Sequence, residues 1–555
     1  MLSWRKRPRH GEQSVSPAGH DADRLLALRK RGRSLLEGGD PAAARRILDE
    51  SLRSFPDDAE LNLLSGFAQL ALEDAQSALD HFHLALHYDP ANAFALRGRV
   101  QALERIGQSW RIETAYREFL SANPENVEAL CGMAGALCER GEFDQAAELL
   151  QSALQRQPER VDALNLLGLV TARDLGQLQA GERLIRRALE IHPDHEPARS
   201  NLGWILALQR RYEEALDCLN QVLERNPADH ETRLMRAYLH LRRGDFAEGW
   251  KDIEARHHSR LAVPRQRDLP EWRGEQLIEK GLLVYPEQGV GDQIMYASCL
   301  EEVLERAARV IIECEPRLVP LFQRSFPRAT VRADSPHPPD VSWRHDFGKV
   351  DCQIAMGSVP ALFRTAWSDF PRHHGYLRAD PEKVQAWKRR LEALSSRRKI
   401  GISWRGGSLK TRTQLRSIPI ESWSPILNRE ATLVSLQYGA VDQDLRHARE
   451  SAGIQVLHFP EAIEDFEETA ALIESLDLVI SVCTWIVHLA GALGKETWVL
   501  TPSIPEWRYL DAGNSMPWYP SVRLFRQRET NCWEPVIADI ARLLDSRLAT
   551  ESLPR

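Results

Sequence analysis

The segments HYDPANAFAL (residues 87–96) and SANPENVEAL (121–130) contain the feature that decides the fold of the first half of the chain: a proline between two helix-forming stretches. Equivalent prolines recur at Pro56, Pro90, Pro124, Pro158, Pro193 and Pro227. Successive prolines are thus separated by a nearly constant interval, about 34 residues. Because proline interrupts a helix, each one marks the turn between two helices. The period therefore predicts stacked helix–turn–helix units that form a right-handed solenoid.

Small residues recur where the two helices of a unit must approach each other, and with the period they resemble the tetratricopeptide repeat. The matching positions in two units are Gly66, Ala78, Phe82, Ala85, Pro90, Gly203, Ala215 and Pro227. The unit at 93–126 departs from the pattern, because Ile112 stands where a small residue is expected. The last unit, with GDFAEGWKDIE at 244–254, predicts a modified end of the solenoid. Such a surface usually binds a polypeptide, and stabilisation or oligomerisation of the chain is the alternative role.

Composition sets limits on partners and location. The 555 residues are 43% hydrophobic and 27% charged, which predicts several folded domains. The net charge of -7 argues against nucleic acid as a partner. The first residues lack the apolar segment of a secretory signal, and no apolar stretch is long enough to cross a membrane, so a cytoplasmic protein is expected. The eight cysteines show neither zinc-ligand spacing nor a disulfide framework, and no metal site is expected.

After residue 263 the pattern changes to short β-rich runs that alternate with helices. Strands are predicted at 399–403, 432–436, 478–482 and 497–500, and GLLVY (281–285) precedes a glycine-containing turn. Alternation of this kind predicts parallel sheets, with ligands at the carboxyl ends of their strands. The charged helix-forming stretch near 380–398 divides this half into two lobes. The predicted divisions are a polar basic tail (1–24), about seven helix pairs (25–263), a linker (264–280), an N-terminal lobe (281–380), a C-terminal lobe (381–545) and a tail (546–555).

The first candidate segment is Glu-Gln-Gly-Val-Gly-Asp at 287–292, directly after a predicted strand. Gly289 and Gly291 would allow a close approach of the backbone to a ligand. Asp292 at a strand-to-helix turn has the placement that a general base requires. The alternative is a tight turn in which Asp292 caps the helix.

The second candidate segment is the stretch from 401 to 420, which contains four cations and no carboxylate. The cations are Arg405, Lys410, Arg412 and Arg416. Positive charge after a buried strand suits a diphosphate, which arginine binds through two hydrogen bonds. A solvated basic loop is the alternative.

The third candidate segment runs from 481 to 494, where a strand leads directly into a helix. The free N–H groups near Thr484, Trp485 and Ile486 would form an anion site at the start of that helix. His488 lies one turn later on the same side. For a single histidine on an apolar helix, a place in the core is the alternative.

Together, several motifs resemble the glycosyltransferase domain that follows tetratricopeptide repeats in many bacterial proteins. This domain is related to lipopolysaccharide heptosyltransferases and more distantly to O-linked N-acetylglucosamine transferases. The resemblance covers roughly residues 270–544. It rests on VGDQIMYASCL (290–300), SIPI (417–420), SLQYG (435–439), DLVISVCTWIVHLAGALGKETWVL (477–500), PEWRYL (505–510) and MPWYPSVRLFRQ (516–527).

The resemblance implies a GT-B fold of two Rossmann-like lobes and inverting, metal-independent transfer from a nucleotide sugar, with no further cofactor. Asp292 occupies the position of the catalytic base. The residues implied in donor binding are Gly289, Gly291, Arg405, Lys410, Arg416, Gln437, Tyr438, Cys483, Thr484, Trp485 and His488. Arg416 would face the diphosphate, and Gln437 and Tyr438 the nucleoside. Many relatives have Asp-Thr where this chain has Cys483-Thr484, which implies a different donor or weakened activity.

The resulting hypothesis is a glycosyltransferase whose repeats hold a protein acceptor while the α/β region transfers a sugar to a side-chain hydroxyl. Flagellin or another surface-structure subunit is an acceptor by analogy alone. A lipid or saccharide acceptor is one alternative. A non-catalytic scaffold with an inactive transferase region is another.

Overall fold

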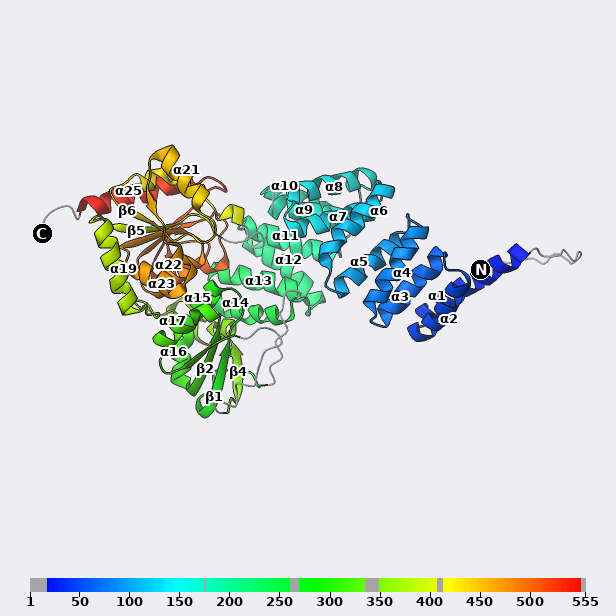
Figure 1. The fold of residues 1–555 in the computed structure, drawn as a ribbon, viewed down its shortest axis with the longest axis horizontal. Helices are drawn as coiled ribbons and strands as arrows, with labels where there is room; N and C mark the ends of the chain where they lie inside the picture. Colours follow the sequence, from blue (N-terminus) through cyan, green and yellow to red (C-terminus); the bar gives the residue numbers. More distant parts are fainter. Residues whose placement is uncertain (1–16, 174–175, 260–268, 335–348, 407–412, 551–555) are drawn as a thin grey trace, which may run out of the picture. The chain divides into compact units, whose positions relative to one another are not determined.

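The computed structural model describes residues 17–173, 176–259, 269–334, 349–406 and 413–550 (Figure 1). The chain forms two compact units, Met1–Asn201 and Leu202–Arg555. Lys410 and Arg412, two cations of the predicted basic loop, lie outside the described residues.

The first part of the chain is an all-helical tetratricopeptide repeat region, as predicted. Its described helices follow one another in seven pairs. Their bounds are α1 Pro17–Glu37, α2 Pro41–Ser54, α3 Ala59–Ala71, α4 Ala75–Tyr88, α5 Ala93–Arg105, α6 Ile112–Ala122, α7 Val127–Arg140, α8 Phe143–Arg156, α9 Val161–Arg173, α10 Leu178–Ile191, α11 Glu196–Leu208, α12 Tyr212–Arg225, α13 His230–Arg243 and α14 Phe246–Ile253. A short 3₁₀ helix, η1 (Ser109–Arg111), precedes α6.

The recurring prolines lie two residues before the residue that caps the next helix. After Pro56, Pro90 and Pro124, the capping residues are Asp58, Asn92 and Asn126. Each cap accepts a hydrogen bond from the backbone N–H three residues later, at 2.8, 3.1 and 2.9 Å respectively. The proline thus ends the preceding helix, and the side chain that follows satisfies a free N–H group of the next one.

Glycines of successive repeats make room for one large side chain. Phe82 of α4 is fully buried. A Cβ atom at Gly66 of α3 would lie 2.6 Å from its ring, and a Cβ atom at Gly98 of α5 would lie 2.3 Å from it. Adjacent repeats therefore interlock through Phe82, and only glycine fits at these two positions.

The second unit contains an α/β region with two sheets. The first sheet has the order β3-β2-β1-β4 and is parallel throughout (Figure 1). Its strands are β1 Leu277–Tyr285, β2 Ala307–Cys314, β3 Thr330–Ala333 and β4 Cys352–Ala355, and its helices include α15 Val290–Tyr296, α16 Leu300–Arg306, α17 Val319–Ser325 and α18 Pro360–Phe363. The helix α19 (Pro381–Leu394) follows and leads into the second sheet.

The second sheet has the order β10-β11-β9-β8-β5-β6-β7, and only the β10–β11 pair is antiparallel among its described strands. Its strands are β5 Lys399–Ser403, β6 Thr432–Ser435, β7 Val456–Leu457, β8 Leu478–Val482, β9 Thr497–Thr501, β10 Ser515–Met516 and β11 Tyr519–Arg526. The helices between and after them are α20 Ser424–Leu427, α21 Asp442–Ala452, α22 Pro460–Glu464, α23 Phe466–Glu474, α24 Trp485–Ala492 and α25 Glu534–Thr550. The central strands β6, β8 and β9 are buried along their whole length, as parallel strands covered on both faces must be.

The last repeat helices pack with the α/β region inside the second unit. Trp250 of α14 is buried, and its indole N–H donates to the Arg364 carbonyl oxygen at 2.7 Å. Arg242 of α13 forms an ion pair with Asp511 at 3.0 Å. One apolar cluster includes Trp250, Leu282 of β1 and Val487 of α24. The predicted solenoid of residues 25–263 is thus shared between the two units.

The predicted linker 264–280 is ordered where the structure describes it. Glu271 bridges Gln353 beside β4, Trp272 is buried, and β1 begins at Leu277. This part of the predicted linker belongs to the first sheet. Among the described helices, none is long and apolar enough to cross a membrane.

Replacing Phe82 by Ala should remove the ring that joins three helices. We expect a loss of about 3–5 kcal/mol in the free energy of unfolding of the repeats, because the cavity left between two glycines has little means of closing. Urea unfolding followed by far-UV circular dichroism measures this loss. Phe94→Ala is the matched control, since that ring is 61% exposed. Equal effects of the two substitutions would contradict the interlocking role.

Candidate functional site

Asp292 lies in the first turn of α15, beyond the carboxyl end of β1. The helix cap is Gly289, and no side chain caps it. The carboxylate of Asp292 instead accepts two hydrogen bonds from the Arg508 guanidinium, one of them from Nε at 2.7 Å. The capping interpretation of Asp292 is therefore wrong, and this carboxylate faces a residue between β9 and β10 of the second sheet.

A second arginine holds the turn before Asp292. Glu287 accepts hydrogen bonds from Arg256 at 2.6 to 3.0 Å and from the backbone N–H of Gly357 at 3.0 Å. Arg256 follows α14 and is buried. Burial opposes its charge, but the carboxylates of Glu287 and Glu254 outweigh burial and raise its pKa. The glycine turn is thus fixed to the end of the repeat region.

Glu506 connects the two arginines of the site. Its carboxylate pairs with Arg416 at 2.9 Å and with Arg508 at 3.2 Å. Burial disfavours the charge of Arg508, yet Asp292 and Glu506 together raise its pKa, so the guanidinium stays protonated. Two carboxylates and two guanidinium groups therefore balance each other in one chain of ion pairs, from Asp292 through Arg508 and Glu506 to Arg416.

The start of α24 lies beside Arg416, at one end of this series of ion pairs. Thr484 caps the helix and accepts from the Ile486 N–H at 3.2 Å. Arg416 points at the same place, because its guanidinium lies 3.5 Å from the Cys483 carbonyl oxygen. A Cβ atom at Gly406 would lie 2.7 Å from the Thr484 methyl group. The first residues and the last residues of the basic loop thus both meet the turn between β8 and α24.

Cys483 is a buried, neutral thiol. Burial raises its pKa to about 12, and its Sγ lies 3.8 Å from the Leu500 carbonyl oxygen. An aspartate here would add a third carboxylate beside Glu506. Because Cys483 is neutral, the charge beside this turn comes from Arg416.

His488 is a core residue that joins the two sheets. Its Nδ1 lies 3.1 Å from the Tyr519 hydroxyl oxygen. Burial, and then the charge of Arg508, lower its pKa to about 3. A Cβ atom at Gly291 would lie 3.2 Å from its ring, so α15 and α24 meet here. His488 is neutral and enclosed by protein groups, which agrees with the core interpretation and gives no phosphate contact.

Gln437 connects the ends of β5 and β6 through side-chain hydrogen bonds. Its side-chain oxygen accepts from the backbone N–H groups of Trp404 and Arg405 at 3.0 and 2.8 Å. Its amide nitrogen donates to the carbonyl oxygens of Arg405 and Tyr438, both at 3.1 Å. All its hydrogen-bonding capacity toward these loops is in use, so its side chain is not free to bind a nucleoside.

Two further predicted residues lie apart from the chain of ion pairs. The Arg405 side chain pairs with Asp444 at 2.8 Å, away from Arg416. Tyr438 is half-buried beside Trp485, with ring centroids 6.3 Å apart, and Trp485 in turn packs on Phe466 at 4.5 Å. These three rings form an aromatic group beyond the ends of β6 and β8, of the kind on which a planar base can stack.

Comparison with known proteins begins with the repeats. Profiles of the tetratricopeptide repeat match residues 29–93, 113–169 and 159–228. Protein FlbA of Caulobacter vibrioides is 30% identical over 449 residues, which cover 77% of this chain and 74% of FlbA. The chain belongs to the FlbA family. Neither the repeats nor the α/β region alone is long enough to account for this coverage, so the similarity to FlbA includes parts of both.

Other similarities of this FlbA-family chain concern a smaller share of it. The mitochondrial import receptor subunit TOM70 of Homo sapiens is 23% identical over 222 residues, which cover 39% of this chain and 36% of TOM70. A solved tetratricopeptide repeat protein from Parabacteroides merdae is 18% identical, with a TM-score of 0.37, and covers 41% of this chain and 91% of its own.

The sequence prediction missed the residues that connect the site in this FlbA-family chain. Asp292, Gly291, Arg416, Cys483, Thr484 and His488 are brought together as expected. The connections between them come from Arg508 and Glu506, while Arg256 fixes the turn. Glu506 and Arg508 belong to the motif PEWRYL, which contributes to the sequence prediction only through the family resemblance. A Glu and an Arg two residues apart at a strand end were the available signal.

Replacing His488 by Gln should flatten the pH dependence of stability. An unfolded histidine has a pKa of about 6.5, so between about 3 and 6.5 the unfolded chain binds a proton that the folded chain does not. Stability therefore falls as the pH decreases through this range, by about 2 kcal/mol between pH 7.5 and 5 for this one group.

Urea titrations of the wild type and of His488→Gln at pH 7.5 and 5 measure the difference. His374→Gln is the control, because that side chain is exposed. If His488→Gln loses as much stability on acidification as the wild type, the buried neutral histidine does not contribute to the pH dependence.

Proposed function

We propose that this chain is a glycosyltransferase of the GT-B type, which moves a sugar from a nucleotide sugar to a side-chain hydroxyl of a protein held by its repeats. The observation that carries the proposal is the convergence of Asp292, Arg416 and the start of α24. These groups follow the carboxyl ends of the parallel strands β1, β5 and β8, where α/β proteins bind their ligands. FlbA is a relative whose name indicates no activity.

In the proposed reaction, Asp292 takes the proton of the acceptor hydroxyl. The hydroxyl oxygen attacks the sugar carbon from the side opposite the nucleotide, and the bond between that carbon and the phosphate oxygen breaks. The leaving diphosphate carries the negative charge that develops. Arg416 and the N–H groups at the start of α24 would stabilise this charge without a metal ion.

Arg508 would act as a positioning residue in this mechanism. Its guanidinium holds one carboxylate oxygen of Asp292, Oδ1, and so fixes the orientation of the base. Glu506 pairs with Arg416 at 2.9 Å. Donor binding would therefore require the diphosphate to replace Glu506 as the partner of Arg416.

One observation favours a second candidate, a scaffold with an inactive α/β region. All four charges of the site already neutralise one another, and Cys483 replaces the usual aspartate. A thermal-shift screen with nucleoside diphosphates and nucleotide sugars distinguishes the two. A rise in melting temperature that Arg416→Gln abolishes supports the transferase, and no response to any compound supports the scaffold.

The transferase proposal predicts that Asp292→Asn lowers the rate of sugar transfer by about 10²- to 10⁴-fold, because asparagine has no basic oxygen but nearly the same shape. The assay uses purified protein, a panel of nucleotide sugars and a bacterial lysate, and intact protein masses report transfer. Flagellin or another surface-structure subunit is the first acceptor to examine, and a sugar gained instead by lipid or saccharide would point to the other acceptor class.

The matched control is Glu301→Gln, which removes an exposed carboxylate of α16. It should leave the rate unchanged. Full transfer by Asp292→Asn would reject Asp292 as the base, whatever the identity of the acceptor.

A further inference from the structure

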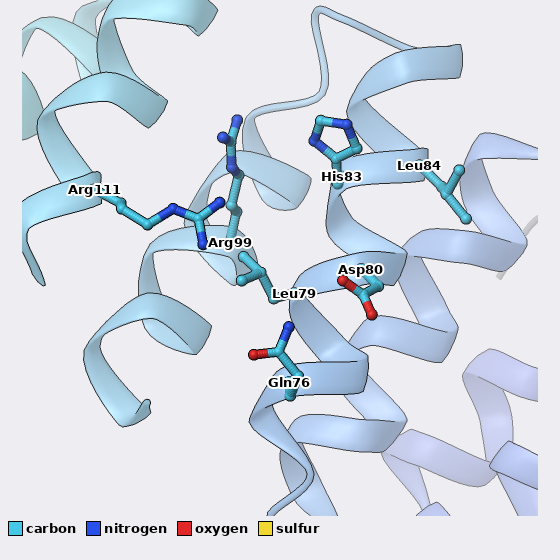
Figure 2. Close-up of a pocket in the computed structure, with 7 residues that line it drawn as sticks. All are labelled: Gln76, Leu79, Asp80, His83, Leu84, Arg99 and Arg111. Atoms are coloured by element: carbon cyan, nitrogen blue, oxygen red, sulfur yellow. The ribbon is translucent and has the colours of Figure 1, made fainter. Parts of the chain in front are cut away.

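A hollow of about 420 Å³ opens in the first unit, between α4, α5 and η1 (Figure 2). It lies between α4 of one repeat and the segments α5 and η1 of the next. Its lining residues are Gln76, Leu79, Asp80, His83, Leu84, Arg99 and Arg111. His83 is exposed here.

The hollow has a cause in the sequence, namely Ile112. The second helix of each other repeat carries alanine or glycine at this position, and each is buried: Ala44, Ala78, Ala146, Gly181, Ala215 and Gly249. A small residue lets the first turn of the helix approach its partner. Ile112 is too large for that approach and is only partly buried. Residues 109–111 accordingly form η1, and α6 has 11 residues where α4 and α8 have 14.

Two arginines give the hollow its charge. Arg99 of α5 has a side chain that is 10% exposed and pairs with Glu118 at 2.8 Å. Arg111 of η1 is bonded to the neutral Gln108 at 2.7 Å and lies beside the ring of Trp110. Within the described part of the chain, no ion pair joins Arg111 to a carboxylate. A guanidinium with free donors thus faces the hollow.

Apolar surface adjoins these charges. Leu84 is 38% exposed at the edge of the hollow, and Trp110, next to Arg111, is 78% exposed. Asp80, the acidic residue of the lining, lies on α4, apart from Arg111 in Figure 2. The volume suits a few side chains of an extended segment and excludes a folded domain.

We propose that this hollow binds an acidic segment of a partner polypeptide. A glutamate or aspartate of the segment would accept hydrogen bonds from Arg111. An apolar neighbour would rest on Leu84. The proposal concerns the repeats alone and stands whether or not the α/β region is a transferase.

The test uses the full chain and two fluorescein-labelled peptides of twelve residues. One has the core Glu-Leu-Glu-Glu-Leu-Glu between Gly-Ser ends, and in the other each Glu is Gln. Fluorescence polarisation at moderate salt should show that the Glu peptide binds about tenfold more tightly or better than the Gln peptide. Equal binding of both peptides, or no binding of either at millimolar protein, would overturn the proposal.

The location is tested with charge-reversal variants that keep the fold. Arg111→Glu should weaken binding of the Glu peptide by about tenfold or more. Leu84→Glu, which places a negative charge at the opposite edge, should do the same. Arg53→Glu makes the same charge change on the exposed surface of α2 and should leave binding unchanged. Equal losses for Arg53→Glu and Arg111→Glu would mean that binding follows overall charge, and would reject the site.

Discussion

The guanidinium of Arg508, whose side chain is 14% exposed, is the group on which the α/β region depends. It lies between Asp292, which follows β1 of the first sheet, and Glu506, which lies between β9 and β10 of the second sheet. Removing two charges from water is costly, and the cost is recovered only when geometry and pairing are good. Separating the two carboxylates from Arg508 would leave an uncompensated buried charge. These ion pairs therefore add to the apolar cluster that joins the two sheets.

The turn that carries Asp292 is held from both ends. Arg256 fixes Glu287 at its start, and Arg508 fixes Asp292 at its end. The glycine between them, Gly291, lets α15 approach α24 so closely that a Cβ atom there would be in tight contact with His488, at 3.2 Å. A carboxylate confined in this way loses little further freedom when a substrate binds, which is what a preorganised base requires. A purely structural connection between the two sheets would need the same confinement. Only a measurement of sugar transfer distinguishes a catalytic base from such a connection.

Periodic features of the fold could be predicted from the sequence, while pairwise contacts could not. The proline spacing determined the repeats, and runs such as KIGIS and LVISV became β5 and β8 at their predicted residues. Short elements such as β7 and β10 have only two residues and leave no pattern. Local composition was enough to predict that Arg416 and Thr484 belong to the site. The role of Gln437, which links the ends of β5 and β6, depends instead on two loops that are distant from each other in the sequence. Such partners meet only through the tertiary fold.

The packing of α13 and α14 against the α/β region limits how the number of repeats can change in evolution. Whole repeat units before Leu202 can be gained or lost without altering any contact inside the second unit. The final pair lacks this freedom, because Arg242, Trp250 and Arg256 all have partners in the α/β region. Relatives that differ in length are therefore expected to vary in their early repeats. They should keep the final pair, because it is inherited together with the α/β region rather than with the rest of the solenoid.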